Sequence, residues 1–194
     1  MKLLFSLLIV STIFTAGLVQ SVSGQSRGAL RSAERISGDR FTVALRTPRG
    51  ARIYAVSRPN AAMLNAIDRG LTDLFAAARR NGYSRLLNYS DYTVFIAKPD
   101  RQKNADGNYS TDLAVGAGQY AGTDYDKGGY IYAAGMVISN SPAAFLIAEH
   151  RSDLSRVADI VRFEGEHLVL YHNDRRRYSQ TADHSRGGGH PILQ

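Results

Sequence analysis

The strongest periodic pattern of apolar residues lies between Pro59 and Gly82 and predicts an amphipathic helix. Apolar side chains recur there at three- and four-residue spacing, which places them on one helical face: Met63, Leu64, Ile67, Leu71, Leu74, Phe75 and Ala78. Pro59 suits the first turn of a helix, and Asn81-Gly82 is typical of a helix end.

A second amphipathic helix is predicted in the C-terminal third of the chain. Ser152 or Asp153 can cap its first turn, because a short side chain with an oxygen accepts a hydrogen bond from a free backbone N–H group. We expect this helix to end near Asn173-Asp174. Its apolar positions are Val157, Ile160, Val161 and Leu168.

Short segments rich in β-branched and aromatic residues predict strands. They cover residues 41–45, 52–56, 92–97, 129–138 and 143–148. The first two flank a Thr-Pro-Arg-Gly turn and are expected to form a hairpin. The strand at 129–138 is expected to be interrupted or bulged at Gly135, and residues 100–129 before it are expected to form a long loop.

The order of these elements predicts the fold class. A hairpin, a helix, three strands, a helix and a polar tail indicate one α+β domain over residues 41–194, with a mostly antiparallel sheet packed by two main helices. The first helix is expected to bury its apolar face against strand residues. The predicted contact set is Leu64, Ile67, Leu71, Leu74 and Phe75 against Val94, Ile96, Ile131 and Ile147.

The N-terminal segment has the pattern of an export signal. A positive start at Met1-Lys2 precedes an apolar run, and the small residues Val22-Ser23-Gly24 offer a cleavage site before Gln25. The sequence therefore predicts a signal peptide at 1–24, a loosely ordered lead-in at 25–40 with a weak helical tendency, and a secreted or periplasmic protein. An uncleaved anchor is the alternative. After signal removal no membrane span is expected.

Composition and charge exclude several classes of protein. The chain contains no cysteine, which excludes disulfides, cysteine-ligated zinc, iron–sulfur clusters and cysteine nucleophiles. Its net charge is +7, and eight arginines lie between residues 27 and 58. These arginines are not interleaved with stacking aromatic residues, so we interpret them as a solvated basic face and expect no nucleic-acid partner.

The histidines suggest metal chemistry. All five lie in the last 45 residues, at 150, 167, 172, 184 and 190. Glu164 and His167 are three positions apart, about 60° around a helix, and can face one centre. His172 is about 140° from His167, which requires the helix to unwind near Tyr171.

These residues predict a site for a divalent metal ion, with zinc preferred. The expected ligands are His167, His172, His184 and Glu164. Either Glu164 or Glu166 is expected to act as the general base toward a water molecule.

The segment Phe163-Glu164-Gly165-Glu166-His167 resembles the motif of zincin-type metallopeptidases. The resemblance covers residues 60–190 in layout and 163–172 in motif. The signature H-E-x-x-H is absent, and the inverted form H-x-x-E-H is half present, with Phe163 in place of the first ligand. This resemblance implies a zinc-dependent hydrolase of the metallopeptidase-like type, acting on a peptide or an envelope component.

The alternative function belongs to a different class. The chain would be a non-catalytic secreted or envelope binding module with structural histidines, and Glu164 and Glu166 would pair with Arg162 and the arginines at 175–177. No nucleophile elbow or P-loop is present, while a serine–histidine–acid triad stays open as an alternative because its members need not be close in sequence.

Overall fold

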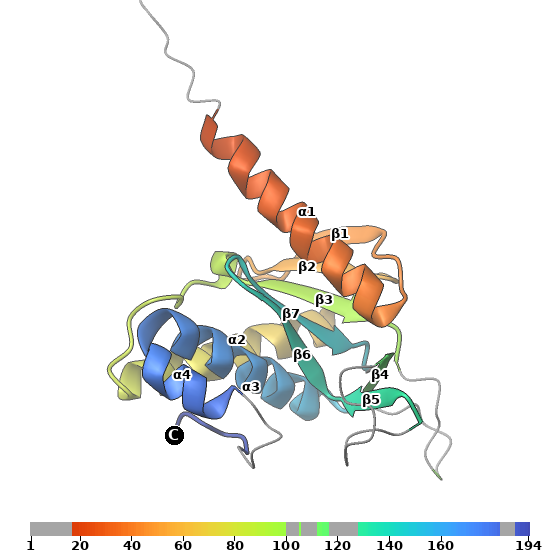
Figure 1. The fold of residues 1–194 in the computed structure, drawn as a ribbon. Helices are drawn as coiled ribbons and strands as arrows, with labels where there is room; N and C mark the ends of the chain where they lie inside the picture. Colours follow the sequence, from red (N-terminus) through yellow and green to blue (C-terminus); the bar gives the residue numbers. More distant parts are fainter. Residues whose placement is uncertain (1–16, 100–104, 106–111, 117–127, 183–188) are drawn as a thin grey trace, which may run out of the picture.

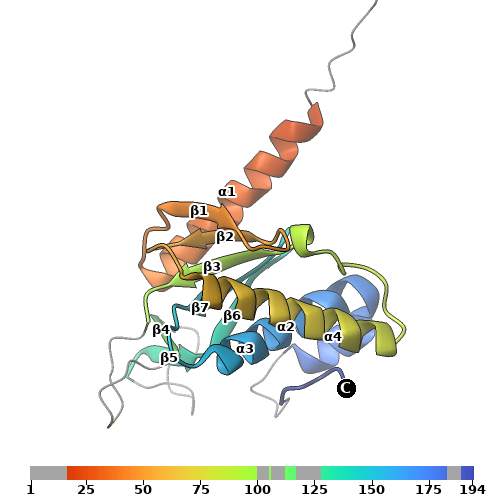
Figure 2. The same ribbon diagram turned by 180° about the vertical axis from the view of Figure 1, so that it is seen from behind.

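The computed structural model describes residues 17–99, 105, 112–116, 128–182 and 189–194. Its centre is a five-stranded sheet with the strand order β1-β2-β3-β7-β6. Helix α1 lies on one side of this sheet, and α2 and α3 lie on the other (Figures 1 and 2). The two sides form separate apolar clusters, one with α1 and one with α2 and α3.

The central strands are parallel and the outer strands antiparallel. Strands β2 (Arg52–Ala55), β3 (Thr93–Ala97) and β7 (Ala143–Ala148) run parallel, while β1 (Val43–Arg46) and β6 (Gly135–Asn140) flank them in the opposite direction. Every residue of β3 and β7 is buried, as expected for central strands covered on both faces.

A second, two-stranded sheet contains β4 (Leu113–Gly116) and β5 (Tyr130–Ala133). Among the strands in the described part of the chain, three pairings are antiparallel and two are parallel. The predicted α+β class with a mostly antiparallel sheet is therefore confirmed. Strand β4 was not predicted, because the segment around it is polar and glycine-rich.

The predicted break at Gly135 separates two sheets. Strand β5 ends at Ala133 and pairs with β4, whereas β6 begins at Gly135 and pairs with β7. The predicted contact of Ile131 with the α2 face is therefore wrong: Ile131 packs in the cluster that contains α1. The other predicted strand residues, Val94, Ile96 and Ile147, do pack with α2.

Both main helices lie close to their predicted limits, but Pro59 precedes the cap of α2 and is not in its first turn as predicted. Helix α2 (Ala61–Arg80) is capped by Asn60, whose side chain accepts a hydrogen bond from Met63 N at 2.8 Å. Helix α3 (Leu154–Asn173) is capped by Asp153, one of the two predicted residues, which accepts from Arg156 N at 3.0 Å. A 3₁₀ turn, η1 (Tyr89–Asp91), precedes β3, and the short helix α4 (Arg175–Thr181) follows α3.

Helix α1 (Gly17–Ser37) covers most of the segment 25–40, which was predicted to be only loosely ordered. Among residues 27–37 of this helix, the buried positions are Ala29 and Ala33, four residues apart, and they pack on the sheet beside Phe95 and Leu146. Such small side chains gave only a weak apolar signal among the arginines. Among the helices in the described ranges, none combines the length and apolar character needed to cross a bilayer. Cleavage before Gln25 stays a prediction.

Helices α2 and α3 cross closely at two glycines. A methyl group at Gly70 would overlap the carbonyl oxygen of Ala158, and one at Gly165 would overlap the side chain of Leu74. The absence of both side chains lets the helix backbones approach, and this contact sets the rotation of α3 about its axis. That rotation determines which polar residues of α3 face β6 and the C-terminal tail.

We expect Leu71→Ala to destabilise the protein by about 3 kcal/mol. Leu71 is fully buried between α2, α3 and the sheet, so truncation removes apolar contacts and leaves a cavity. Chemical denaturation at constant m-value measures the loss. Asp73→Ala, an exposed position on the same helix, is the control and should change stability by less than about 0.5 kcal/mol. Equal midpoints for the two variants would contradict the assigned face.

Candidate functional site

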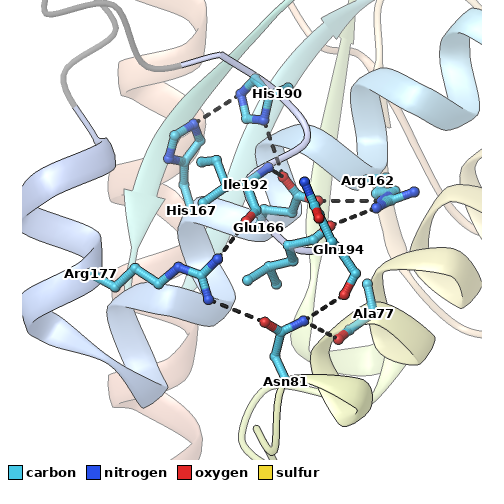
Figure 3. Close-up of polar contacts among 10 residues, drawn as sticks. Ala77, Asn81, Arg162, Glu166, His167, Arg177, His190, Ile192 and Gln194 are labelled. Atoms are coloured by element: carbon cyan, nitrogen blue, oxygen red, sulfur yellow. Dashed lines mark hydrogen bonds and ion pairs between the residues drawn. The ribbon is translucent and has the colours of Figure 1, made fainter.

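Glu166 of α3 is a fully buried carboxylate with three polar partners. Its Oε1 lies 3.3 Å from Arg162 Nε, one turn earlier on the helix. Its Oε2 accepts a hydrogen bond from Ile192 N at 2.8 Å and lies 3.2 Å from His190 Nδ1 (Figure 3). A buried charge is tolerated when it is paired and hydrogen-bonded in this way.

The partners of Glu166 join α3 to the C-terminal tail, residues 189–194. Arg162 Nη2 also donates to Leu193 O at 2.8 Å, and Leu193 is fully buried. From α4, Arg177 Nη2 donates to Ile192 O at 2.6 Å. These bonds place a segment that lacks regular secondary structure firmly against α3.

The C-terminal residue is held as well. Asn81, at the end of α2, donates from Nδ2 to Gln194 O at 2.9 Å and accepts at Oδ1 from Arg177 Nη1 at 3.2 Å (Figure 3). The tail is therefore bonded to α2, α3 and α4 together. Its path explains how a histidine close to the C-terminus reaches the middle of α3.

His190 faces His167 through its second ring nitrogen. The two Nε2 atoms are 3.2 Å apart, and the rings are nearly perpendicular, at 83°. Because Glu166 accepts at Nδ1 of His190, the proton of a neutral His190 ring resides there. The Nε2 lone pair of His190 then points at His167. We call these two residues the histidine pair.

The ring of His190 is also fixed by stacking on Phe163. The ring centroids are 4.8 Å apart and the planes differ by 15°. Phe163 is four residues before His167, so the imidazole from the tail lies beside the turn that precedes His167. Its orientation is thus held by an aromatic contact on one side and a carboxylate on the other.

Glu164 is a second carboxyl group of α3, half-buried on the side of the helix that faces β6. A Cβ atom at Gly135 would lie 2.7 Å from Glu164 Cγ, so the missing side chain makes room for this residue. Burial raises the pKa of Glu164 to about 8. In contrast to Glu166, Glu164 has no hydrogen-bond or ion-pair partner among the residues that the structure describes.

The raised pKa of Glu164 predicts that stability falls as the pH rises. The folded protein keeps the proton up to about pH 8, whereas the unfolded chain loses it near pH 4.5, so ionisation favours unfolding between these values. Glu164→Gln cannot ionise and should be more stable than wild type by up to about 3 kcal/mol at pH 7, with little difference near pH 4.

Denaturant titrations across this pH range measure the effect. Asp159→Asn, an exposed carboxyl on the same helix, is the control and should follow the wild-type curve. A constant difference between Glu164→Gln and wild type at every pH would show that Glu164 does not titrate in this window.

His172 is placed away from the histidine pair, which corrects the predicted arrangement. Helix α3 continues to Asn173 without unwinding near Tyr171. His172 Nε2 instead lies 2.7 Å from Asn140 O at the end of β6, so this nitrogen is engaged by a backbone carbonyl. A neutral His172 that donates from Nε2 has no lone pair on that atom for a metal.

The remaining predicted residues have different outcomes. His184 lies outside the described residues. Within the described ranges, no three side chains of the metal-ligating types form a group that could hold an ion.

The histidine pair itself was missed, because no role was predicted for His190. The apolar Ile192-Leu193 at the end of a polar tail was the available signal that this segment returns to the core.

Comparison with protein-family models, with curated proteins and with solved structures finds no match to this chain. The predicted zincin-like layout therefore gains no support from known proteins and stays a prediction. The fold and the site define an α+β protein whose tail presents one histidine, backed by a buried carboxylate, to another histidine on its last long helix.

Proposed function

We propose that His167 and His190 bind a divalent metal ion, preferably zinc, and that the protein is an exported metal-dependent hydrolase. The observation that carries the proposal is the histidine pair, with its two Nε2 atoms 3.2 Å apart. Two imidazole nitrogens bound to one tetrahedral zinc ion at 2.0–2.1 Å are about 3.3 Å apart. The pair therefore has the spacing of two ligands of a common ion.

The buried carboxylate behind His190 supports the same interpretation. A histidine that binds a metal usually donates its other ring N–H to a carboxylate or a carbonyl, which fixes the ring and raises its basicity. Glu166 accepts at Nδ1 of His190 in this manner. Because Arg162, His190 and Ile192 occupy its oxygens, we assign Glu166 a positioning role instead of the role of general base.

Glu164 is the better candidate for the general base. It is three residues before His167, the spacing between the glutamate and the second histidine of H-E-x-x-H helices. Its carboxyl group has no hydrogen-bond or ion-pair partner among the described residues, so no other interaction of the fold engages it. When bound, a divalent ion would act as a Lewis acid and lower the pKa of a water molecule.

The third ligand in this proposal is His184, the imidazole predicted from the sequence. Two histidines alone do not complete a zinc shell, and a catalytic site keeps one position open beyond three protein ligands. The substrate class that we propose is a peptide or another envelope component, and the location is secreted or periplasmic. These last points depend on the export pattern of the first 24 residues and on the metallopeptidase-like motif.

One observation favours the second candidate, a non-catalytic binding module. Glu166 and Arg162 bond to the backbone of Ile192 and Leu193 and hold the tail, so the same network has a structural use without any metal. In that case the 3.2 Å contact is a hydrogen bond between two neutral imidazoles. Metal content separates the two functions.

The test is elemental analysis of protein that has been incubated with zinc and freed of excess metal. We expect about one zinc ion per wild-type chain and per His150→Ala chain, and none in His190→Ala. His150 is a suitable control because its Nδ1 accepts from Asp153 N near the start of α3. Absence of zinc from the wild type would leave the binding module as the function.

A further inference from the structure

A pocket of about 470 Å³ lies on the opposite end of α2 from its N-terminal cap. Its walls come from the β1–β2 turn, the second half of α2 and the segment 87–90 before β3. Pockets that bind small molecules have volumes of roughly 300–1,000 Å³. None of its lining residues belongs to the histidine pair or to the groups that hold the tail, so the pocket is independent of the proposed function.

Two arginines give this pocket a positive character. Arg49 reaches it from the β1–β2 turn and Arg79 from α2. Neither guanidinium forms an ion pair with a carboxylate of the described residues. Arginine presents a planar set of donors that matches carboxylate and phosphate oxygens, so an oxyanion is the complementary ligand.

Arg49 is held in place from two directions. Its Nη1 donates to Tyr89 Oη at 2.7 Å, and its guanidinium carbon lies 5.4 Å from the centre of the Tyr89 ring. Its backbone N donates to Oδ2 of Asp68 at 2.9 Å. Asp68 is buried and does not line the pocket, so it orders the turn without blocking the arginines.

The wall beside the arginines is aromatic. Phe75 is buried on α2 and packs edge-on against Tyr89, with 5.0 Å between the ring centroids. The hydroxyl groups of Thr72 and Tyr89 are 2.8 Å apart and fix the tyrosine. This wall offers contact for a flat apolar group next to the charged end of the pocket.

We propose that this pocket binds a small organic oxyanion with a flat ring. The carboxylate or phosphate group would lie against Arg49 and Arg79, and the ring against Phe75 and Tyr89. The arginines supply charge-assisted hydrogen bonds, and the aromatic wall distinguishes such a ligand from an inorganic anion.

The test is calorimetric titration of the full chain with four probes. Phenyl phosphate and benzoate represent the two oxyanions, inorganic phosphate lacks the ring, and benzylammonium reverses the charge. We expect phenyl phosphate or benzoate to bind with a Kd of about 1 mM or tighter, inorganic phosphate more weakly, and benzylammonium not to bind. The aromatic probe with the lower Kd shows whether the pocket prefers a phosphate or a carboxylate group.

Matched variants show whether the binding belongs to this pocket. Arg79→Gln and Arg49→Gln should each weaken the tighter probe roughly tenfold or more, because each removes a charged donor. Arg80→Gln, the next residue on α2 and not part of the lining, should bind as wild type does. Unchanged melting temperatures confirm that the variants are folded.

Two results would overturn the proposal. One is the absence of saturation by both aromatic probes up to about 10 mM. The other is an equal loss of affinity in Arg79→Gln and Arg80→Gln, which would indicate attraction to a generally basic surface. Zinc binding or its absence has no bearing on either result.

Discussion

Alanine in place of either member of the histidine pair should lower the affinity for zinc by roughly 100-fold or more. Loss of a residue behind a ligand already costs roughly 10- to 100-fold in metal affinity, and loss of the ligand itself removes a bond. His167→Ala and His190→Ala are therefore expected to bind zinc far more weakly than wild type. Competition with a chromophoric chelator measures the dissociation constants.

Two further variants test whether a loss of zinc affinity is specific to the histidine pair. His172→Ala should bind as wild type does, because Nε2 of His172 is engaged by Asn140 O. His150→Ala serves as the control from outside the site. An affinity loss in His172→Ala equal to that of His167→Ala would restore the ligand set expected from the sequence. Equal affinities in all four variants would make the pair structural.

Glu166→Ala should destabilise the protein by about 3–5 kcal/mol, the usual cost of removing one partner of a buried ion pair. The substitution leaves the half-buried guanidinium of Arg162 without its carboxylate and Ile192 N without an acceptor. It also releases the ring of His190. Denaturant midpoints at constant m-value give the loss, and amide exchange at Ile192 and Leu193 reports detachment of the tail.

Glu166→Gln separates charge from hydrogen bonding. Glutamine can still accept from Ile192 N but carries no charge for Arg162, so its loss should be about half that of Glu166→Ala or less. Asp159→Ala, an exposed position on the same helix, should change stability by less than about 0.5 kcal/mol. A Glu166→Ala variant as stable as this control would show that the tail is held by other contacts.

The helices and the buried strands were predictable because their signals are local. The three- and four-residue spacing in α2 and the capping residues Asn81 and Asp153 act within one or two turns of the chain. The parallel pairing of β2, β3 and β7 is not a local property. For β2 and β3 it arises because α2 carries the chain back across the sheet between them, and for β3 and β7 the chain returns through β4, β5 and β6.

The candidate site likewise combines residues that are close in sequence with a residue that only the tertiary structure brings near them. Glu164 and His167 lie about one turn apart on one helix, so spacing alone predicts that they face one centre, and this stays a prediction. His190 reaches this helix through side-chain bonds from Arg162, Asn81 and Arg177 to tail residues, and those bonds join segments up to 113 residues apart in sequence. No periodic pattern in the tail could have predicted that path.

The most direct test of the histidine pair as a metal site is a crystal structure of the zinc-loaded protein with anomalous data collected at the zinc absorption edge. The account predicts one anomalous peak at about 2.0–2.1 Å from Nε2 of both His167 and His190, with Glu166 still bonded to Nδ1 of His190. A peak at His172 or elsewhere, with the two Nε2 atoms still in contact with each other, would contradict it.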